Sequence, residues 1–196
     1  AGRPMIRIEP AGAEALLLSL PITRLELLLG KYAGLAAALT LSTVAGFAVV
    51  AVLLYQRFNT AGLFHYLGFV LSSVLLGLAF LSLAMLLSVL AKDRARASGL
   101  AIGLWFLLVL VFDLALLGVL VATGGAFGGE GFAYLLLLNP ADIFRVLNVF
   151  SLDDVRRLYG LASIVPPALG NPWLMGAAMA GWIVAPLALA SWRFRP

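Results

Sequence analysis

Few side chains in this sequence could take part in chemistry, and they lie far apart along the chain. The single histidine, His65, has no partner in a hydrolytic constellation, which needs a base beside a nucleophile. Met175 and Met179 lie one helical turn apart and carry thioethers, which are soft copper ligands, but methionine is also a common filler of apolar cores. With one histidine and no cysteine, we expect neither a metal site nor a catalytic residue.

A glycine-rich segment at residues 124–131 could suggest nucleotide binding. It lacks the Lys-Ser/Thr pair that ends a P-loop, so we interpret it as a flexible joint. We therefore expect no cofactor on this chain.

Asp113 is the one acidic residue inside a long apolar run. An ionised carboxylate at the centre of a membrane helix costs about 2.5 to 3.5 kcal/mol on insertion scales, so this side chain should face protein or water. Two interpretations stay open. Asp113 is either neutral and hydrogen-bonded to a neighbouring helix, or it lines the cavity of a transport path.

The elements that must position these groups are four apolar runs of about twenty residues, a length that matches the hydrocarbon core of a bilayer. They cover residues 35–54, 67–90, 100–121 and 173–192. Hydrophobic residues make up 63% of the chain and charged residues 11%, which a soluble domain could not bury. We predict an all-α integral membrane protein with four transmembrane helices. Small-residue pairs such as Gly30 with Gly34 and Ser73 with Gly77 predict packing seams, and Pro186 predicts a kink.

Basic residues gather beside one set of span ends, which the positive-inside rule places in the cytoplasm. The residues on that side are Arg24, Lys31, Lys92, Arg94, Arg96, Arg193 and Arg195, against mainly Arg57 on the other. The net charge of +4 is therefore a topology signal, and we expect no nucleic-acid partner. The C-terminus should be cytoplasmic, and Tyr32 should mark the cytoplasmic interface.

The approach to the first span, residues 13–31, predicts a break at Pro21 and a helix start near Arg24. Thr23 and Glu26 have the spacing of a capping box, in which hydroxyl and carboxylate satisfy the orphan amides of a helix start. This helix either lies among the headgroups or presses against a cytoplasmic partner. Residues 1–12 form an atypical tail without a signal peptide, and we expect a trimmed or discontinuous chain there.

The long segment between the third and fourth runs, residues 124–172, should hold short helices on the outer side. Asn139, Pro140 and Asp142 predict a capped helix start, followed by a second helix at residues 151–160. We expect both helices to rest their apolar sides on the outer ends of the spans. Their charged side chains are candidates for docking a periplasmic partner: Asp142, Arg145, Asp153, Asp154, Arg156 and Arg157.

A family resemblance covers the chain from about residue 15 to its end. Residues 16–31, Leu-Leu-Leu-Ser-Leu-Pro-Ile-Thr-Arg-Leu-Glu-Leu-Leu-Leu-Gly-Lys, resemble the coupling segment of type 2 ABC exporter permeases, and residues 91–98 resemble an intracellular loop of that family. The preceding residues 11–15 depart from the family's usual Glu-Arg-Gly-Thr-Leu ending. Residues 110–114 and 138–147 are similar to the permeases that serve maturation of nitrous oxide reductase.

The resemblance implies a type 2 ABC exporter permease fold, in which the family has six spans. It implies a homodimeric permease in the bacterial inner membrane, driven by a cytoplasmic ABC ATPase that binds ATP and Mg, and docked on a periplasmic repeat protein. The cargo would be a sulfur species for the copper-sulfide site of nitrous oxide reductase. The residues expected to contact the ATPase are Ser19, Leu20, Pro21, Ile22, Thr23, Arg24, Glu26, Lys92, Asp93, Arg94 and Arg96. The chain itself would not be an enzyme.

Other functions remain open at this point. The chain could export another cargo, such as a lipid or drug, or act as a passive membrane anchor for a periplasmic complex. An ion-coupled carrier is less favoured, because one intramembrane acid is a poor inventory for proton or sodium coupling. We divide the chain into a tail (1–12), a coupling segment (13–31), three spans (32–123), a periplasmic gate segment (124–172) and the last span with its cytoplasmic tail (173–196).

Overall fold

A computed structural model describes residues 23–57, 60–125, 134–150 and 171–193. These residues form helices and no strand, which confirms the all-α prediction. In chain order the elements are α2 (Arg24–Arg57), α3 (Thr60–Leu90), α4 (Arg94–Phe106), the π-helix η1 (Leu107–Val111), α5 (Phe112–Ala122), the 3-10 helix η2 (Leu136–Leu138), α7 (Pro140–Phe150) and α9 (Pro172–Arg193).

Four stretches in the described residues are long and apolar enough to cross a membrane, as predicted. They are Leu25–Gln56, Leu63–Leu90, Arg94–Ala122 and Pro172–Arg193. The 34 residues of α2 rise about 51 Å, which exceeds the roughly 30 Å of the hydrocarbon core. The helix therefore continues without a break across the expected boundary at residues 31 and 32.

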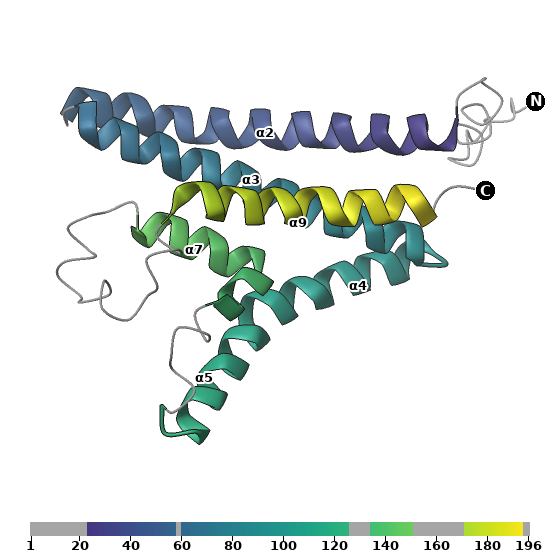
Figure 1. Ribbon diagram of the computed structural model, residues 1–196. Coiled ribbons are helices and arrows are strands. Elements are labelled where there is room, and N and C mark those ends of the chain that lie inside the picture. The colour runs from purple at the N-terminus through teal and green to yellow at the C-terminus, as the bar shows by residue number, and fades with distance from the viewer. Residues whose placement is uncertain (1–22, 58–59, 126–133, 151–170, 194–196) are drawn as a thin grey trace, which may run out of the picture.

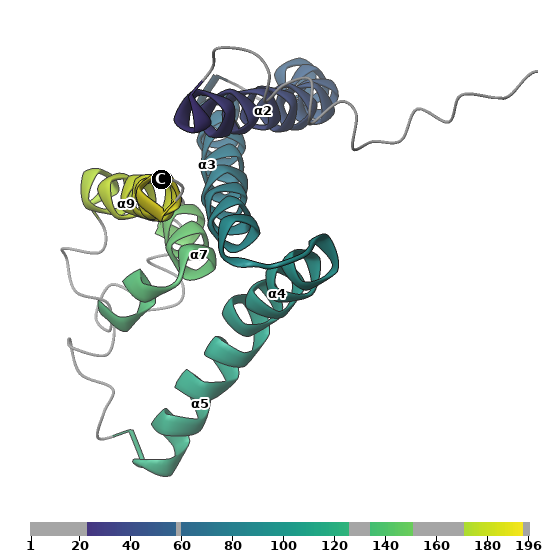
Figure 2. The ribbon, with the colours of Figure 1, turned by 90° about the vertical axis from the view of Figure 1, so that its right-hand side faces the viewer.

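Helix α3 is the centre of the bundle. It contacts α2, α9, α4 and α7, and Figure 2 shows α2 above it and the α7–α9 pair to its left (Figures 1 and 2). One buried cluster joins α3 to α7 and α9 through Ala79, Ile143, Met175 and Met179. The two methionines are thus fully buried core residues.

Hydrogen bonds from tyrosines tie α2 to α3 inside the bundle. The Tyr32 hydroxyl is 2.9 Å from Ser82 Oγ and donates to the Leu78 carbonyl at 3.4 Å. The Tyr66 hydroxyl donates to the Phe47 carbonyl at 2.9 Å. The Tyr32 hydroxyl thus points into the helix pair, and its predicted place at the cytoplasmic interface stays a prediction.

The third span is bent where its α-helical pattern gives way to the π-helix η1. Figures 1 and 2 show α5 turning away from α3 and α9 beyond this point. No residue of α5 is buried in the described chain. Local π-helical turns are a known cause of sharp helix bends, so η1 explains the bend that the sequence analysis did not predict.

The small-residue pairs are mostly not packing seams within the described part of the chain. Gly77 is the exception, because a Cβ there would lie 2.8 Å from Leu39 Cδ2. A Cβ added at Gly30, Gly34, Gly99 or Gly103 would meet open space. Gly77 therefore leaves room for the Leu39 side chain of α2, while α9 continues as one helix through the buried Pro186.

Candidate functional site

One end of the bundle collects the predicted basic residues that the structure describes, and Arg195 lies outside the described residues. Here α2 begins, α3 connects to α4, and α9 ends (Figure 1). Leu28, Met85 and Ala190 form a buried cluster that holds α2, α3 and α9 together at this end. We call it the basic end. Its assignment to the cytoplasm stays a prediction.

The predicted capping box at the start of α2 is confirmed. The Thr23 amide donates to Glu26 Oε2 at 2.7 Å, and the Glu26 amide donates to Thr23 Oγ1 at 3.2 Å. These reciprocal bonds satisfy two amides that no helical carbonyl can reach. They fix where the helix begins. Ser19, Leu20, Pro21 and Ile22 lie outside the described residues.

Asp93 caps the start of α4, which the sequence analysis missed. Its Oδ1 accepts from the Arg96 amide at 2.8 Å, and its Oδ2 lies 3.2 Å from Arg96 Nε. An aspartate three residues before the paired amide is a common N-cap signal. Both carboxylate oxygens are therefore engaged by Arg96, and these contacts fix the start of α4.

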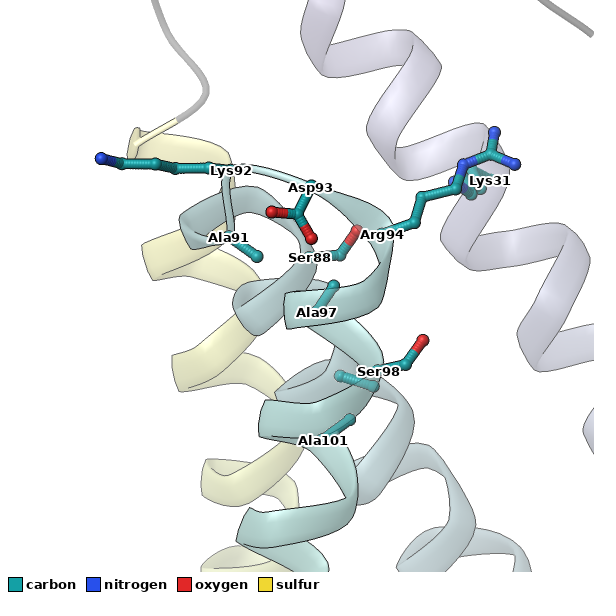
Figure 3. Close-up of a pocket in the computed structure, with 10 residues that line it drawn as sticks. Lys31, Ser88, Ala91, Lys92, Asp93, Arg94, Ala97, Ser98 and Ala101 are labelled. Carbon is teal, nitrogen blue, oxygen red and sulfur yellow. The ribbon is translucent and has the colours of Figure 1, made fainter.

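A cavity of about 510 Å³ opens beside this turn, between α2, α3 and α4 (Figure 3). Its lining combines cationic side chains with hydroxyls and small apolar residues. The lining residues are Lys31, Ala84, Ser88, Ala91, Lys92, Asp93, Arg94, Ala97, Ser98 and Ala101.

A second polar site lies where α7 meets the bent third span. It consists of Asp113, Asn139, Asp142 and Arg145, and we call it the α7 polar cluster. Arg145 Nη1 donates to Asp113 and, at 2.7 Å, to Asp142 Oδ1. The guanidinium thus links one acid on α5 with another on its own helix. A cation shared by two carboxylates forms charge-assisted hydrogen bonds, which are stronger than neutral ones.

The cluster also supplies hydrogen bonds to the backbone of η1. Asn139 Nδ2 donates to the Leu108 carbonyl at 2.6 Å, and Arg145 Nη2 donates to the Val109 carbonyl at 3.3 Å. In a membrane helix, a bend is tolerated when side chains or neighbouring helices satisfy the backbone groups that it exposes. The start of α7 therefore stabilises the bend in the third span.

Asn139 has two roles, of which the sequence predicted one. Its Oδ1 accepts from the Ala141 amide at 3.0 Å, which confirms the N-cap of α7. Its Nδ2 group donates to the Leu108 carbonyl at 2.6 Å and to Asp142 Oδ2 at 2.9 Å. Asn139 is fully buried, so every bond of this side chain replaces one to water.

Asp142, one of the predicted docking residues, has a side chain that is only 5% exposed and is bonded to Asn139 and Arg145, so its docking role stays a prediction. Arg145 remains 44% exposed, but its guanidinium faces Asp113. Burial, followed by the charge of Asp113, raises the pKa of Asp142 to about 6 although Arg145 lowers it. Asp153, Asp154, Arg156 and Arg157 lie outside the described residues.

Asp113 has an ionic partner that neither interpretation of the sequence considered. Its carboxylate is 37% exposed and pairs with Arg145, 32 positions further along the chain. This arrangement agrees with the interhelix contact that was one of the two alternatives, but the partner is a cation and not a neutral group. Whether Asp113 also lines a transport path stays a prediction.

Further contacts hold the rest of α7 against the bundle. Asn148 Nδ2 donates to Ser72 Oγ at 3.1 Å on α3, and Trp182 Nε1 on α9 donates to the Leu137 carbonyl at 3.0 Å. Ile143 is fully buried between these helices. The helix is thus packed into the bundle and not only laid on the outer ends of the spans.

Comparison with known proteins agrees with this architecture. The model of a family described as ABC-2 family transporter protein matches residues 10–195. A protein of Pseudomonas aeruginosa named probable ABC transporter permease protein NosY is 42% identical over 193 residues, covering 95% of this chain and 69% of that protein. A protein of the same name from Stutzerimonas stutzeri is 39% identical over 194 residues, again covering 95% and 69%.

Proposed function

The chain belongs to the ABC-2 family of transporter proteins, and from this premise we propose that it exports a sulfur species for the copper-sulfide site of nitrous oxide reductase. The family makes the chain a permease subunit and not an enzyme. It also implies an ATPase partner and a dimeric assembly. The cargo, the direction of transport and the periplasmic repeat protein are parts of the proposal, which the resemblance to NosY permeases supports.

The continuity of α2 carries the mechanistic part of this proposal. The helix runs uninterrupted for 34 residues from its capping box to the far end of the bundle. In our proposal the ATPase, which holds ATP and Mg, presses on the segment 19–26 and on the turn with Lys92, Asp93, Arg94 and Arg96. A helix with a satisfied first turn transmits such a movement as a rigid element, because its end does not fray.

The α7 polar cluster supports an outer gate in the same mechanism. Helix α7 contacts α3 and α9 through apolar packing and holds the third span through Arg145 and Asn139. A movement of α3 or α9 would therefore reach the bend at η1 through α7. In our proposal this bend changes when the permease opens outward. In our proposal, α7 and the segment that follows it also meet the periplasmic partner.

Transport into membrane vesicles tests the proposal. The full-length permease and its ATPase are reconstituted together, and sulfur accumulation is followed with and without ATP. A variant ATPase that binds but does not hydrolyse ATP is the matched control. ATP-dependent accumulation of sulfur is the expected result. Accumulation of a lipid or drug instead would assign a different cargo, and loss of ATP dependence for every cargo would indicate a passive membrane anchor.

A further inference from the structure

We propose that the cavity at the basic end binds the phosphate headgroup of an anionic phospholipid. The inference needs only that the protein lies in a membrane, so it does not depend on the cargo or on the direction of transport. The cavity measures about 510 Å³ and lies between α2, α3 and α4 at the basic end of the bundle (Figure 3).

The charges of the lining favour an anion. Lys31 on α2, Lys92 in the turn before α4 and Arg94 at the start of α4 all line the cavity. The acidic lining residue, Asp93, has both carboxylate oxygens engaged by Arg96, which is not part of the lining. The two lysines are therefore not neutralised by that acid. Basic pockets between transmembrane helices are typical sites for anionic lipid headgroups.

The positions of the side chains suit a phosphate. Figure 3 shows Arg94 extending from α4 toward α2, where Lys31 lies, while Lys92 points outward at the rim. The Ser98 hydroxyl points into the gap that faces α2, and Ser88 contributes a second hydroxyl from α3. Ammonium, guanidinium and hydroxyl groups can all donate to phosphate oxygens.

Small residues leave room for the headgroup between these donors. Ala84 on α3 and Ala97 and Ala101 on α4 line the inner wall of the cavity. A larger side chain at any of these positions would occupy the space itself. The open volume of the cavity therefore lies beside its cationic side chains.

Apolar side chains directly below the cavity distinguish a lipid from a free phosphate. One helical turn deeper than Lys31, on the same face of α2, lies Leu35, which is 45% exposed. One turn deeper than Ser98 on α4 lies Ile102, which is 68% exposed. A headgroup in the cavity would place its acyl chains along these residues. The ATPase, which we propose contacts the turn with Lys92 and Arg94, would also meet these cations, but it would not cover the apolar side chains beneath them.

Lipid binding to the full-length permease in detergent tests the inference. The probe is dihexanoyl phosphatidylglycerol, with dihexanoyl phosphatidylcholine and inorganic phosphate as comparisons. The variant Lys31→Gln removes one cation of the lining, and Ala101→Leu fills the cavity without changing charge. The control Arg193→Gln removes an equal charge at the same end of the bundle but outside the cavity. Each variant is first compared with the wild type for monodispersity and melting temperature.

The expected result is preferential binding of phosphatidylglycerol by the wild type. Lys31→Gln should weaken this binding about fivefold, which corresponds to about 1 kcal/mol for one basic residue near anionic lipid. Ala101→Leu should weaken it as well, whereas Arg193→Gln should leave it unchanged.

Three results would overturn the inference. Equal losses for Lys31→Gln and Arg193→Gln would mean that only the general surface charge attracts the lipid. Inorganic phosphate binding as tightly as phosphatidylglycerol would indicate a site for the free anion. If Lys31→Gln left lipid binding unchanged but reduced capture of the ATPase, the cavity would belong to the interface between permease and ATPase. Since no transport is measured, the inference can fail while the proposed cargo is correct, and the reverse also holds.

Discussion

Replacing Arg145 with methionine should loosen α7 from the third span. The change keeps an unbranched apolar stem but removes the guanidinium that binds Asp113, Asp142 and the Val109 carbonyl. Asp142 is then left almost fully buried without its cation, while Asn139 remains its neighbour. The loss should therefore be larger than for a surface ion pair.

The size of the loss follows from the exposure of each contact. A hydrogen bond to a charged, buried group such as Asp142 contributes about 1.5 to 3 kcal/mol. The pair with Asp113 is more than a third exposed on both sides, so solvent screening limits it to about 1 kcal/mol or less. The 3.3 Å contact with Val109 adds little. We expect a total of about 3 kcal/mol, or roughly 6 to 12 °C in melting temperature for a chain of this size.

Thermal unfolding of the purified permease in detergent measures this loss. Arg193→Met is the matched control, because Arg193 is an exposed arginine at the end of α9. The double variant Arg145→Met with Asp142→Asn should recover part of the stability, since the amide at position 142 no longer needs a cation. An equal shift for Arg145→Met and the control, or no recovery in the double variant, would refute the role of Arg145 as a link between the helices.

Three further predictions concern other contacts. Replacing Thr23 and Glu26 with alanine should cost about 1 kcal/mol of helix stability and reduce ATPase binding and transport in membranes; unchanged values for both would exclude a coupling role for the helix start. Gly77→Leu should destabilise the permease by about 1 to 3 kcal/mol in the same unfolding assay through overlap with Leu39, and Leu39→Ala should relieve it; a neutral Gly77→Leu would show that the α2–α3 contact yields easily. Because the pKa of Asp142 is raised from 3.8 to about 6 on folding, its neutral form favours the folded state at low pH, and this contribution is lost as the pH rises from about 4 to 6. Melting temperatures across this range should fall more steeply for the wild type than for Asp142→Asn, and parallel profiles would contradict the shifted pKa.

The sequence alone determined the features that depend on short stretches of chain. The four spans follow from the length of each apolar run against the thickness of a bilayer, and all four are confirmed. The capping box at Thr23 and the start of α7 at Pro140 follow from side chains that bond amides two or three residues away. The membrane class and the family could therefore be inferred before any fold was known.

Only the tertiary structure decided which distant residues meet. Asp113 and Arg145 are 32 positions apart, and the residues around each of them do not indicate that the two side chains pair. The bend at η1 persists where Asn139 and Arg145 satisfy carbonyls of another helix, so the sequence around residues 107–111 does not predict it. Asp142 illustrates the same limit. A charged residue in a first helical turn was expected on a docking face, but its burial depends on how α7 packs against the other helices, because desolvation and ion pairing are set by neighbours that are remote in sequence.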